Sequence, residues 1–381
     1  MSKAAELAAL IANVNKGSSL TAKNFIINGA QNVAQRGTSS TGIGASSGYF
    51  TTDRMQIVSE NTAGRLTMEQ VADGPDGFAT CTKLTCTTAD TSIASNEALI
   101  LNQNIEGQNL QSLKKGTSDA VPVTVSFYVK ANASATYTIE LKSGDASTNR
   151  MNSHEFSVTT GWTRITKTFV GDTSQPLDDD NETSIQFNLW LHAGSDYTGG
   201  THTDNVWHTT NNQRVGDSNT SFFDSTSRTF FITGIQMEIG EKATEFEHEP
   251  FETTLNKCYR YYFRIAGSDV QSGKIKTSYR KRSGDGYWYN DTSFLAQYIL
   301  PVPMRDVPTA LEQSGTDSDY DVAYRGTTST AGGGNLVLFN DANQNYVTTF
   351  QAGHTDNNAT GEAGQQRIRQ AAGYLAWSVE L

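Results

Sequence analysis

The stretch VPVTVSFYV, from Val121 to Val129, decides the fold class of this chain. Its odd-numbered positions are all apolar, and Pro, Thr, Ser and Tyr occupy the even-numbered positions between them. Such strict alternation is typical of a β-strand with one face buried and the other face in water. Half-wet strands belong to antiparallel sheets, so this stretch predicts an all-β protein.

The same alternation returns along most of the chain between Gly-, Ser-, Asn- and Asp-rich turns. The apolar sets are Tyr137, Ile139 and Leu141; Ile185, Phe187, Leu189 and Leu191; and Phe231, Ile235, Met237 and Ile239. Many short antiparallel strands with such turns make a sandwich or a barrel. We therefore predict an antiparallel β-sandwich over residues 24–250.

Two further segments flank the predicted sandwich. Over residues 1–23, Leu7, Leu10, Ile11 and Val14 follow helical spacing, which predicts a short N-terminal helix. Such a helix either caps its own domain or attaches it to a partner surface or to its trimer mates. Residues 251–381 open with one expected helical turn at Glu252 to Lys257 and continue with alternating strands, the first from Tyr259 to Ile265. About 125 residues suffice for a second, smaller β-sandwich-like domain.

Composition narrows the classes of function. The 381 residues carry a net charge of −11, which argues against a nucleic-acid-binding surface. No stretch approaches the roughly 18 apolar residues of a membrane-spanning helix, so we expect no membrane insertion. Three cysteines make no disulfide framework, and the first residues lack a signal peptide. We therefore expect synthesis in a reducing cytoplasm.

The outward face of the strand from Ile185 to His192 is the candidate binding site. An aromatic ring beside amide groups resembles a sugar platform, because the ring stacks on a pyranose while the amides bond its hydroxyls. The candidate carbohydrate-binding residues on this face and in the loop after it are Gln186, Asn188, Trp190, His192, Tyr197 and Trp207. The alternative is that Trp190 packs beneath the long loop from Gly194 to Ser221 as a core residue.

Other clusters point less clearly to chemistry. The spacing of His202, Asp204 and His208 fits no helical two-histidine metal motif. The acidic run from Asp178 to Glu182 lacks the alternating Asp and central Gly of a calcium loop, so we expect a solvated hairpin turn and leave a structural Ca²⁺ there open. No inward strand position carries the paired carboxylates of a glycosidase. We expect no catalytic residue, metal or cofactor.

Several segments resemble sequences that recur in bacteriophage tail fibres and other virion appendage proteins. The longest is ITGIQMEIGEKATEFEHEPFETTLNKCYRYY, residues 232–262. The others are NFIINGAQNVAQRGTS (24–39), VTVSFYVKANASATYTIEL (123–141), GWTRITKTFVGDTS (161–174), FNLWLHAGSDYTGGT (187–201) and FLAQYILPVPMRDVPT (294–309). The resemblance covers about residues 24–309 and weakens after Val322.

This resemblance implies a jelly-roll sandwich similar to carbohydrate-binding modules, followed by a C-terminal β unit. It further implies a virion protein, made in the cytoplasm of a bacterial host, that assembles as a homotrimer. Its expected partners are other virion proteins, reached through the N-terminal segment, and the host cell-surface polysaccharide. Two alternatives stay open: a purely structural virion component, such as an adaptor or capsid decoration, and a polysaccharide depolymerase.

Overall fold

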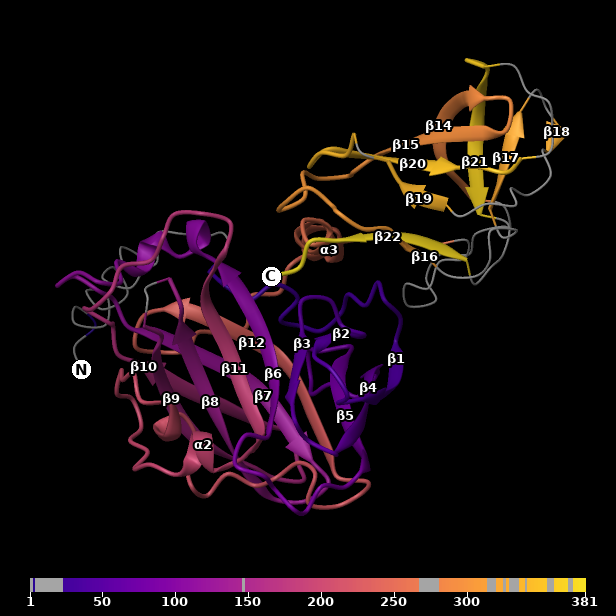
Figure 1. Cartoon of the computed structure of the whole chain (residues 1–381). Helices are drawn as coiled ribbons and strands as arrows, with labels where there is room; N and C mark the ends of the chain where they lie inside the picture. The colour runs from indigo at the N-terminus through magenta and orange to yellow at the C-terminus, as the bar shows by residue number, and fades with distance from the viewer. Residues whose placement is uncertain are drawn as a thin grey trace.

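Two β-rich units follow each other along the chain (Figure 1). The structure is a computed structural model that describes residues 3, 23–145, 148–266, 281–313, 320–324, 327–328, 336–339, 341–354, 360–368 and 373–381. The predicted N-terminal helix over 1–23 lies almost wholly outside the described residues. None of the helices in the described ranges has the length and apolar character needed to cross a membrane.

Two six-stranded antiparallel sheets form the first unit and confirm the predicted sandwich. In spatial order, the first sheet holds β1 (Ser39–Ile43), β4 (Arg65–Val71), β5 (Cys81–Thr88), β12 (Thr229–Ile239), β7 (Val123–Ala131) and β10 (Thr163–Phe169). The second holds β2 (Gly48–Tyr49), β3 (Gln56–Glu60), β6 (Ala98–Glu106), β11 (Thr183–Ala193), β8 (Ala135–Ser143) and β9 (Arg150–Val158). Four short helices lie in the loops: η1 (Gly107–Asn109), η2 (Gln111–Leu113), α2 (Ser195–Thr198) and η3 (Asn211–Gln213).

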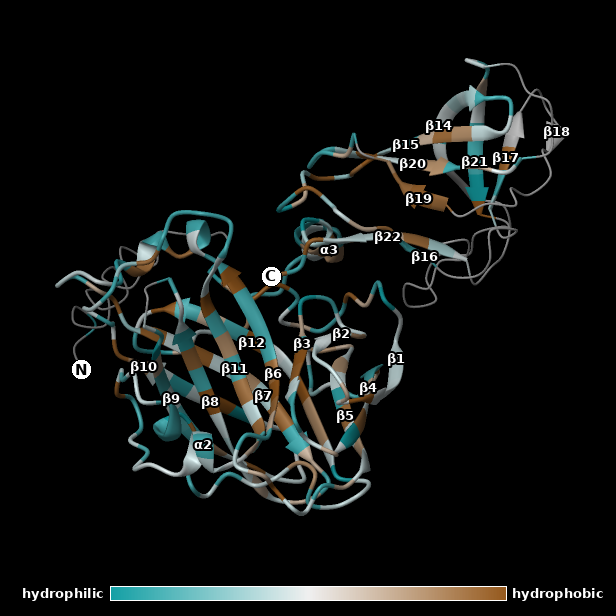
Figure 2. Cartoon of the chain, viewed as in Figure 1, coloured by the Kyte–Doolittle hydropathy of each residue, from teal (hydrophilic) through white to brown (hydrophobic). Residues whose placement is uncertain are grey.

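The core lies between the two sheets, where the alternation predicts it. Figure 2 shows apolar and polar residues alternating along the sandwich strands. Phe127 of β7 and Phe187 of β11 come from opposite sheets, are both fully buried, and hold their ring centroids 6.5 Å apart. Phe156 of β9 packs edge-on against Phe127 at 5.2 Å. Burying such aromatic side chains removes a large apolar area from water, which stabilises the sandwich.

Strand β12 departs from the predicted pattern. Gly234 has φ +62°, and the register of β12 against β7 shifts between Thr233 and Gln236. A β-carbon on Gly234 would meet the Phe78 ring at 2.7 Å, so the close approach requires glycine. The irregularity reverses the alternation, and the prediction that Phe231 faces inward with Ile235 is wrong: Phe231 lies on the outer face.

The second unit begins with α3 (Phe251–Tyr259), a longer helix than the single predicted turn. Because α3 includes Tyr259, the strand that follows it, β13 (Tyr262–Ala266), starts later than predicted. Strand β13 joins β22 (Tyr374–Ser378) and β16 (Glu312–Gln313) in a small sheet. The larger sheet, in spatial order, contains β18 (Thr327–Thr328), β17 (Tyr320–Tyr324), β21 (Ala363–Ile368), β14 (Lys281–Asn290), β15 (Ser293–Ile299), β20 (Tyr346–Gln351) and β19 (Leu336–Leu338).

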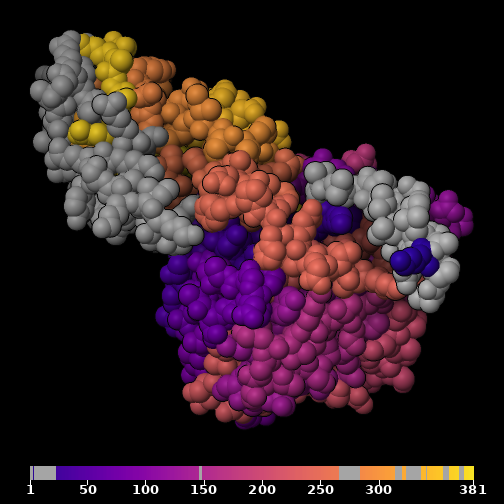
Figure 3. Space-filling model, turned by 180° about the vertical axis from the view of Figure 1, so that it is seen from behind, coloured from indigo at the N-terminus to yellow at the C-terminus, as the bar shows by residue number. Residues whose placement is uncertain are grey.

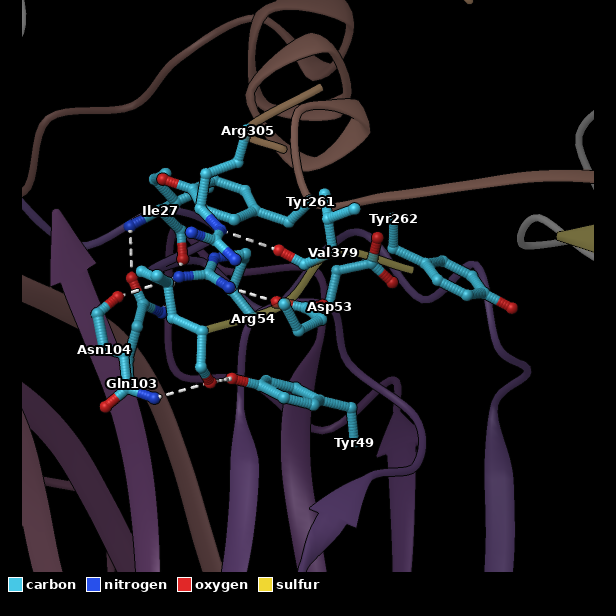
Figure 4. Close-up of polar contacts among 12 residues, drawn as sticks. Ile27, Tyr49, Asp53, Arg54, Gln103, Asn104, Tyr261, Tyr262, Arg305 and Val379 are labelled. Atoms are coloured by element: carbon cyan, nitrogen blue, oxygen red, sulfur yellow. Dashed lines mark hydrogen bonds and ion pairs between the residues drawn. The ribbon is translucent and has the colours of Figure 1, made fainter. Parts of the chain in front are cut away.

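The second unit meets the sandwich at one end (Figure 3). Buried charges join the two units there. Arg54 of the sandwich is 1% exposed, pairs with Glu380, and lies 3.5 Å over the ring of Tyr261 (Figure 4). Arg36 also reaches Glu380, at 3.2 Å, and lies 3.5 Å over the ring of Tyr262. Two arginines of the sandwich thus stack on two consecutive tyrosines of the second unit and share one carboxylate.

A second set of contacts fixes α3 against the end of β6. Glu106 accepts hydrogen bonds from the Arg260 guanidinium at 2.7 and 2.8 Å and from the Tyr261 hydroxyl. Arg305 donates to the Val379 carbonyl at 2.9 Å and pairs with Glu182 at 3.0 Å. The contact with Glu182 places the end of the acidic run at the junction between the units. Asp178, Asp179 and Asp180 are exposed, as expected of a solvated turn, but the segment connects β10 to β11 in different sheets and is not a hairpin.

Candidate functional site

The outward face of β11 is buried in the structure. The Trp190 side chain is 1% exposed, and its indole N–H donates to Glu140 Oε2 at 3.1 Å. Asn188 donates to the same oxygen at 2.8 Å and accepts from Asn102 at 2.7 Å. Trp190 and Asn188 therefore already have hydrogen-bond partners inside the protein.

Arg214 covers this face from the loop between β11 and β12. Its guanidinium binds both oxygens of Glu140, at 2.7 and 2.9 Å, and lies 4.6 Å over the Trp190 ring. Burial acts to raise the pKa of Glu140, but the Arg214 charge and the hydrogen bonds hold that pKa below its ordinary value. Val215 packs against Trp190 beside Arg214. The loop thus places its own cation and apolar side chain where a sugar would have to stack.

The remaining predicted residues are also engaged with the protein. His192 is fully buried between Glu97 and Ser221, and Gln186 donates to Asn104 at 2.9 Å. The Tyr197 hydroxyl donates to Glu60 at 2.7 Å. Trp207 donates to the Val170 carbonyl at 2.7 Å and packs against the sandwich core.

The prediction of an exposed platform on β11 is therefore wrong for Trp190, Asn188 and His192, whose side chains solvent does not reach. The alternative, in which Trp190 packs beneath the loop from Gly194 to Ser221, is confirmed. The alternation in sequence is compatible with an exposed platform and with a packed Trp190. It shows which side chains point away from the core, but not whether another segment covers them.

The histidine cluster in this loop only partly assembles. Asp204 lies between two imidazoles, 3.5 Å from His154 Nδ1 and 3.7 Å from His202 Nδ1. His208 instead pairs through its backbone with Met151 in an isolated bridge. Burial lowers the pKa of His154 more than the neighbouring Asp204 raises it, so a neutral imidazole is favoured there.

An open aromatic surface lies instead on the second unit. Tyr287 is 49% exposed and Tyr289 is 50% exposed, which makes them the two most exposed aromatic side chains among the described residues. Both lie on β14, two positions apart, with the fully buried Trp288 between them. Their exposure and the contact of Tyr289 with Phe350 place both tyrosines on the outer face of the sheet, with Tyr289 at a register shift between Trp288 and Asn290.

Strand pairing extends this face sideways. Tyr287 is paired with Leu295 on β15, Leu295 with Phe350 on β20, and Phe350 with Val337 on β19. Residues paired across neighbouring strands point to the same side of a sheet. Tyr289, Phe350 and Phe339 lie with their ring centroids 6.1 to 6.5 Å apart. We call the surface formed by Tyr287, Tyr289, Val337, Phe339 and Phe350 the aromatic face.

Polar groups border the aromatic face. Gln297 of β15 is paired with Asp285 of β14, one alternation step along from Tyr287, and both side chains are exposed. Asp285 accepts a hydrogen bond from the Gln365 side chain at 2.6 Å. A sugar platform needs exposed rings flanked by hydrogen-bonding groups, and this face has both. The outer face of β11 has the same kinds of residue in its sequence, but they are buried in the structure.

The sequence contains the signal for this face in the run YWYN at 287–290. Aromatic residues at three consecutive positions must place rings on both sides of a strand. Trp288 accounts for the buried side, and the two tyrosines are left for the outer side. The run therefore indicates an aromatic outer face, although the local sequence does not show whether another segment covers it.

Comparisons with known proteins give low similarity. No family model matches the chain, and no curated protein matches it in sequence. A carbohydrate-binding module, CBM4, is 15% identical over 56% of this chain and 98% of its own, with a TM-score of 0.29. The enzymatically active domain of bacteriophage CBA120 tailspike protein 4 is 12% identical over 57% of this chain and 22% of its own, with a TM-score of 0.28.

A third solved structure is the CBM22-1 xylan-binding domain from Paenibacillus barcinonensis Xyn10C. It is 12% identical over 55% of this chain and 100% of its own, with a TM-score of 0.27. At these TM-scores the likenesses decide neither fold nor function. The fold is instead established by the strand topology, and a functional proposal has to start from the side chains described above.

Proposed function

We propose that this protein is a virion appendage protein that attaches the particle to host surface glycans through the aromatic face of its second unit. The proposal combines two independent lines of support. One is the resemblance of residues 24–309 to virion appendage proteins. The other is a surface whose chemistry suits a sugar.

The observation that carries the proposal is the pair of half-exposed tyrosines on β14, with amide and carboxylate groups beside them. Leaving two large aromatic rings in water is unfavourable unless a partner covers them. Both rings are exposed on the same face of β14, with Tyr289 at a bulge where two residues of β14 advance past one of β15. Tyr287 and Tyr289 therefore offer two stacking positions side by side, which suits neighbouring sugars of a polysaccharide.

In this proposal the sandwich carries the glycan-binding unit but does not bind the glycan on β11. The ion pairs of Arg54 and Arg36 with Glu380 hold the second unit in a fixed orientation. Rigid placement limits the entropy lost when the aromatic face meets a ligand. The N-terminal segment, in turn, attaches the chain to other virion proteins.

We further propose a homotrimer, on the basis of the resemblance. A shallow, open platform binds a sugar weakly, and three copies on one particle would raise the effective affinity through avidity. Light scattering on the purified chain tests the trimer. A mass near three times 41.4 kDa supports it, and a monomer contradicts it.

The test of glycan binding compares ring-removing with ring-keeping variants on an array of bacterial surface polysaccharides. We expect Tyr287→Ala and Tyr289→Ala each to weaken binding by at least about tenfold, equivalent to ~1.4 kcal/mol. Tyr289→Phe keeps the stacking surface and should bind nearly as well as the wild type. Val206→Ala, at an exposed apolar position of the sandwich, is the matched control and should bind normally.

Three outcomes would contradict the proposal in different ways. Wild-type glycan binding by the Tyr287→Ala, Tyr289→Ala double variant would remove the aromatic face as the site. If the wild-type chain binds no polysaccharide and the double variant fails to assemble, the purely structural alternative is favoured. Release of new reducing ends from a bound polysaccharide would identify a depolymerase instead.

A further inference from the structure

Three ionisable side chains gather at one end of the sandwich, away from the aromatic face. Asp90, Glu97 and His192 are all buried, and one ligand atom from each lies within 4.8 Å of the other two. Asp90 and Glu97 bracket the loop between β5 and β6, and His192 lies near the end of β11. Three segments that are distant in sequence thus converge on a single point.

The backbone turns His192 toward this point. Along β11, the register against β6 shifts between Trp190 and His192, so Trp190 is paired with Ile100 and His192 with Leu99. Two residues of β11 therefore advance past one residue of β6, which is the signature of a β-bulge. Bulges often re-aim a side chain toward a functional site, and this bulge places the imidazole beside Glu97.

The charges of the group are unbalanced. Within the described part of the chain, no Lys or Arg pairs with Asp90 or Glu97, and the ion-pair partner of Glu97 is His192. Asp90 and Glu97 bring two buried carboxylates to one point, and buried charge must be paired or bound to a metal. One divalent cation balances this charge.

Hydrogen-bond partners outside the group orient two of the three ligands, His192 and Asp90. Ser221 Oγ lies 2.7 Å from His192 Nδ1, on the side of the ring opposite Glu97, and accepts from the Phe223 amide at 3.1 Å. One oxygen of Asp90 accepts from Thr62 Oγ1 at 2.8 Å and from the Ala63 amide at 2.7 Å. Metal-binding histidines and carboxylates are commonly held by such outer partners.

We propose that Asp90, Glu97 and His192 form a structural metal site for a divalent transition-metal ion, with Zn²⁺ as the best match. Imidazole with carboxylate ligands suits borderline ions such as Zn²⁺ better than Ca²⁺, which takes six to eight oxygen ligands. The 3.1 Å between His192 Nε2 and Glu97 Oε2 is close to the ligand separation around a tetrahedral Zn²⁺. A water molecule completes the four ligands.

His192 can bind the ion through Nε2 while Nδ1 keeps its contact with Ser221. Without metal, His192 Nε2 lies 3.1 Å from Glu97 Oε2, and Nδ1 lies 2.7 Å from Ser221 Oγ. With metal, the Nε2 lone pair binds the ion, and the proton resides on Nδ1 and donates to Ser221 Oγ. The Ser221 oxygen then accepts from Nδ1 beside the hydrogen bond that it already accepts from the Phe223 amide.

The test uses the full chain, stripped with a chelator and titrated separately with Zn²⁺, Mg²⁺ and Ca²⁺. We expect one equivalent of Zn²⁺ to remain after desalting, measured as metal content. We also expect a rise in melting temperature that Mg²⁺ and Ca²⁺ do not reproduce, because an ion that binds only the folded chain stabilises it. Asp90→Asn and Glu97→Gln should each lower the Zn²⁺ affinity by at least about tenfold.

Asp204→Asn is the matched control, because Asp204 also lies beside two histidines but is half exposed. This variant should bind Zn²⁺ like the wild type. Wild-type chain that retains no Zn²⁺ would leave Asp90, Glu97 and His192 as a hydrogen-bonded cluster only. Zn²⁺ binding that is lost in Asp204→Asn but kept in Asp90→Asn would move the site to the surface histidines. Neither result bears on glycan binding, so this proposal fails or stands separately.

Discussion

The outer faces of β11 and β14 look alike in sequence and differ in the folded protein. Each outer face combines aromatic and amide side chains: Trp190 lies beside two amides on β11, and Tyr287 and Tyr289 of β14 lie near Gln297 of β15. The loop between β11 and β12 covers the first face with Arg214 and Val215. The second face keeps its tyrosines half exposed.

The difference between these faces separates stability from recognition. On β11 the aromatic and polar groups satisfy one another and a buried carboxylate, so removing any of them should destabilise the fold. On β14 the groups contact solvent, so removing them should leave the fold intact and affect only what binds. Substitutions on β11 should therefore lower stability, whereas substitutions on β14 should weaken binding without changing stability.

The largest expected effect comes from the carboxylate beneath Trp190. Glu140→Ala leaves the Arg214 charge buried without its partner, which should lower the free energy of unfolding by about 3–5 kcal/mol. Urea denaturation measures the change. Asp285→Ala, next to the aromatic face, is the contrasting control and should change stability by no more than about 0.5 kcal/mol. Equal losses of unfolding free energy in Glu140→Ala and Asp285→Ala would contradict the proposed difference between the two faces.

The junction that supports the second unit adds a pH dependence of opposite sign to that of Glu140. Burial raises the pKa of Asp53 to about 6, although Arg36 and the hydrogen bonds from Gln35 lower it. The folded state therefore favours the protonated acid, and stability from Asp53 is lost as pH rises from about 4 through 6. By linkage this loss amounts to roughly 2–3 kcal/mol.

Unfolding free energies measured from pH 4 to pH 7 on the wild type and on Asp53→Asn isolate this effect. The wild type should lose stability relative to the variant across that range. Parallel curves would mean that Asp53 titrates normally. Glu140 acts in the opposite sense, because its lowered pKa gives stability that is present above its ordinary pKa and lost as pH falls.

A smaller effect is expected from trimming the Trp190 ring. Trp190→Phe removes the indole N–H that donates to Glu140 and part of the contact with Arg214. We expect a loss of about 1–3 kcal/mol in stability, as for other buried hydrogen-bonding groups. Glycan binding measured on the folded fraction should be unchanged. Selective loss of binding at full stability would return the site to β11.

The smallest effect on stability is expected on the aromatic face itself. Tyr289→Ala should shift the free energy of unfolding by no more than about 0.5 kcal/mol, because half of the side chain is already in water. Thermal denaturation beside the binding measurement checks this. A loss above ~2 kcal/mol would show that Tyr289 is a core residue of the second unit.

Local alternation predicted the sandwich well because strand burial repeats every two residues. The pattern from Val121 to Val129 became β7, with Val125 and Phe127 fully buried as expected. It failed at β12, where the positive φ of Gly234 reverses the alternation within the strand. The alternation of apolar and polar residues in the sequence does not indicate where such a reversal occurs.

The candidate site was harder to predict because it depends on contacts between distant residues. Arg214 lies 74 positions from Glu140, and Arg54 lies 326 positions from Glu380. Nothing in the local sequence of β11 indicates that a loop will return over it. The aromatic residues of β14 were visible in sequence, but their exposure follows only from the folded sheet.

The most direct test of glycan binding on the aromatic face is hydrogen exchange of the full chain with and without a bound surface polysaccharide from the array. We predict new protection in β14, β15 and β20, within 281–299 and 346–351, and unchanged exchange in β11 and the loop from Gly194 to Ser221. Protection confined to β11 and that loop, with none on β14, would contradict the assignment of glycan binding to the aromatic face.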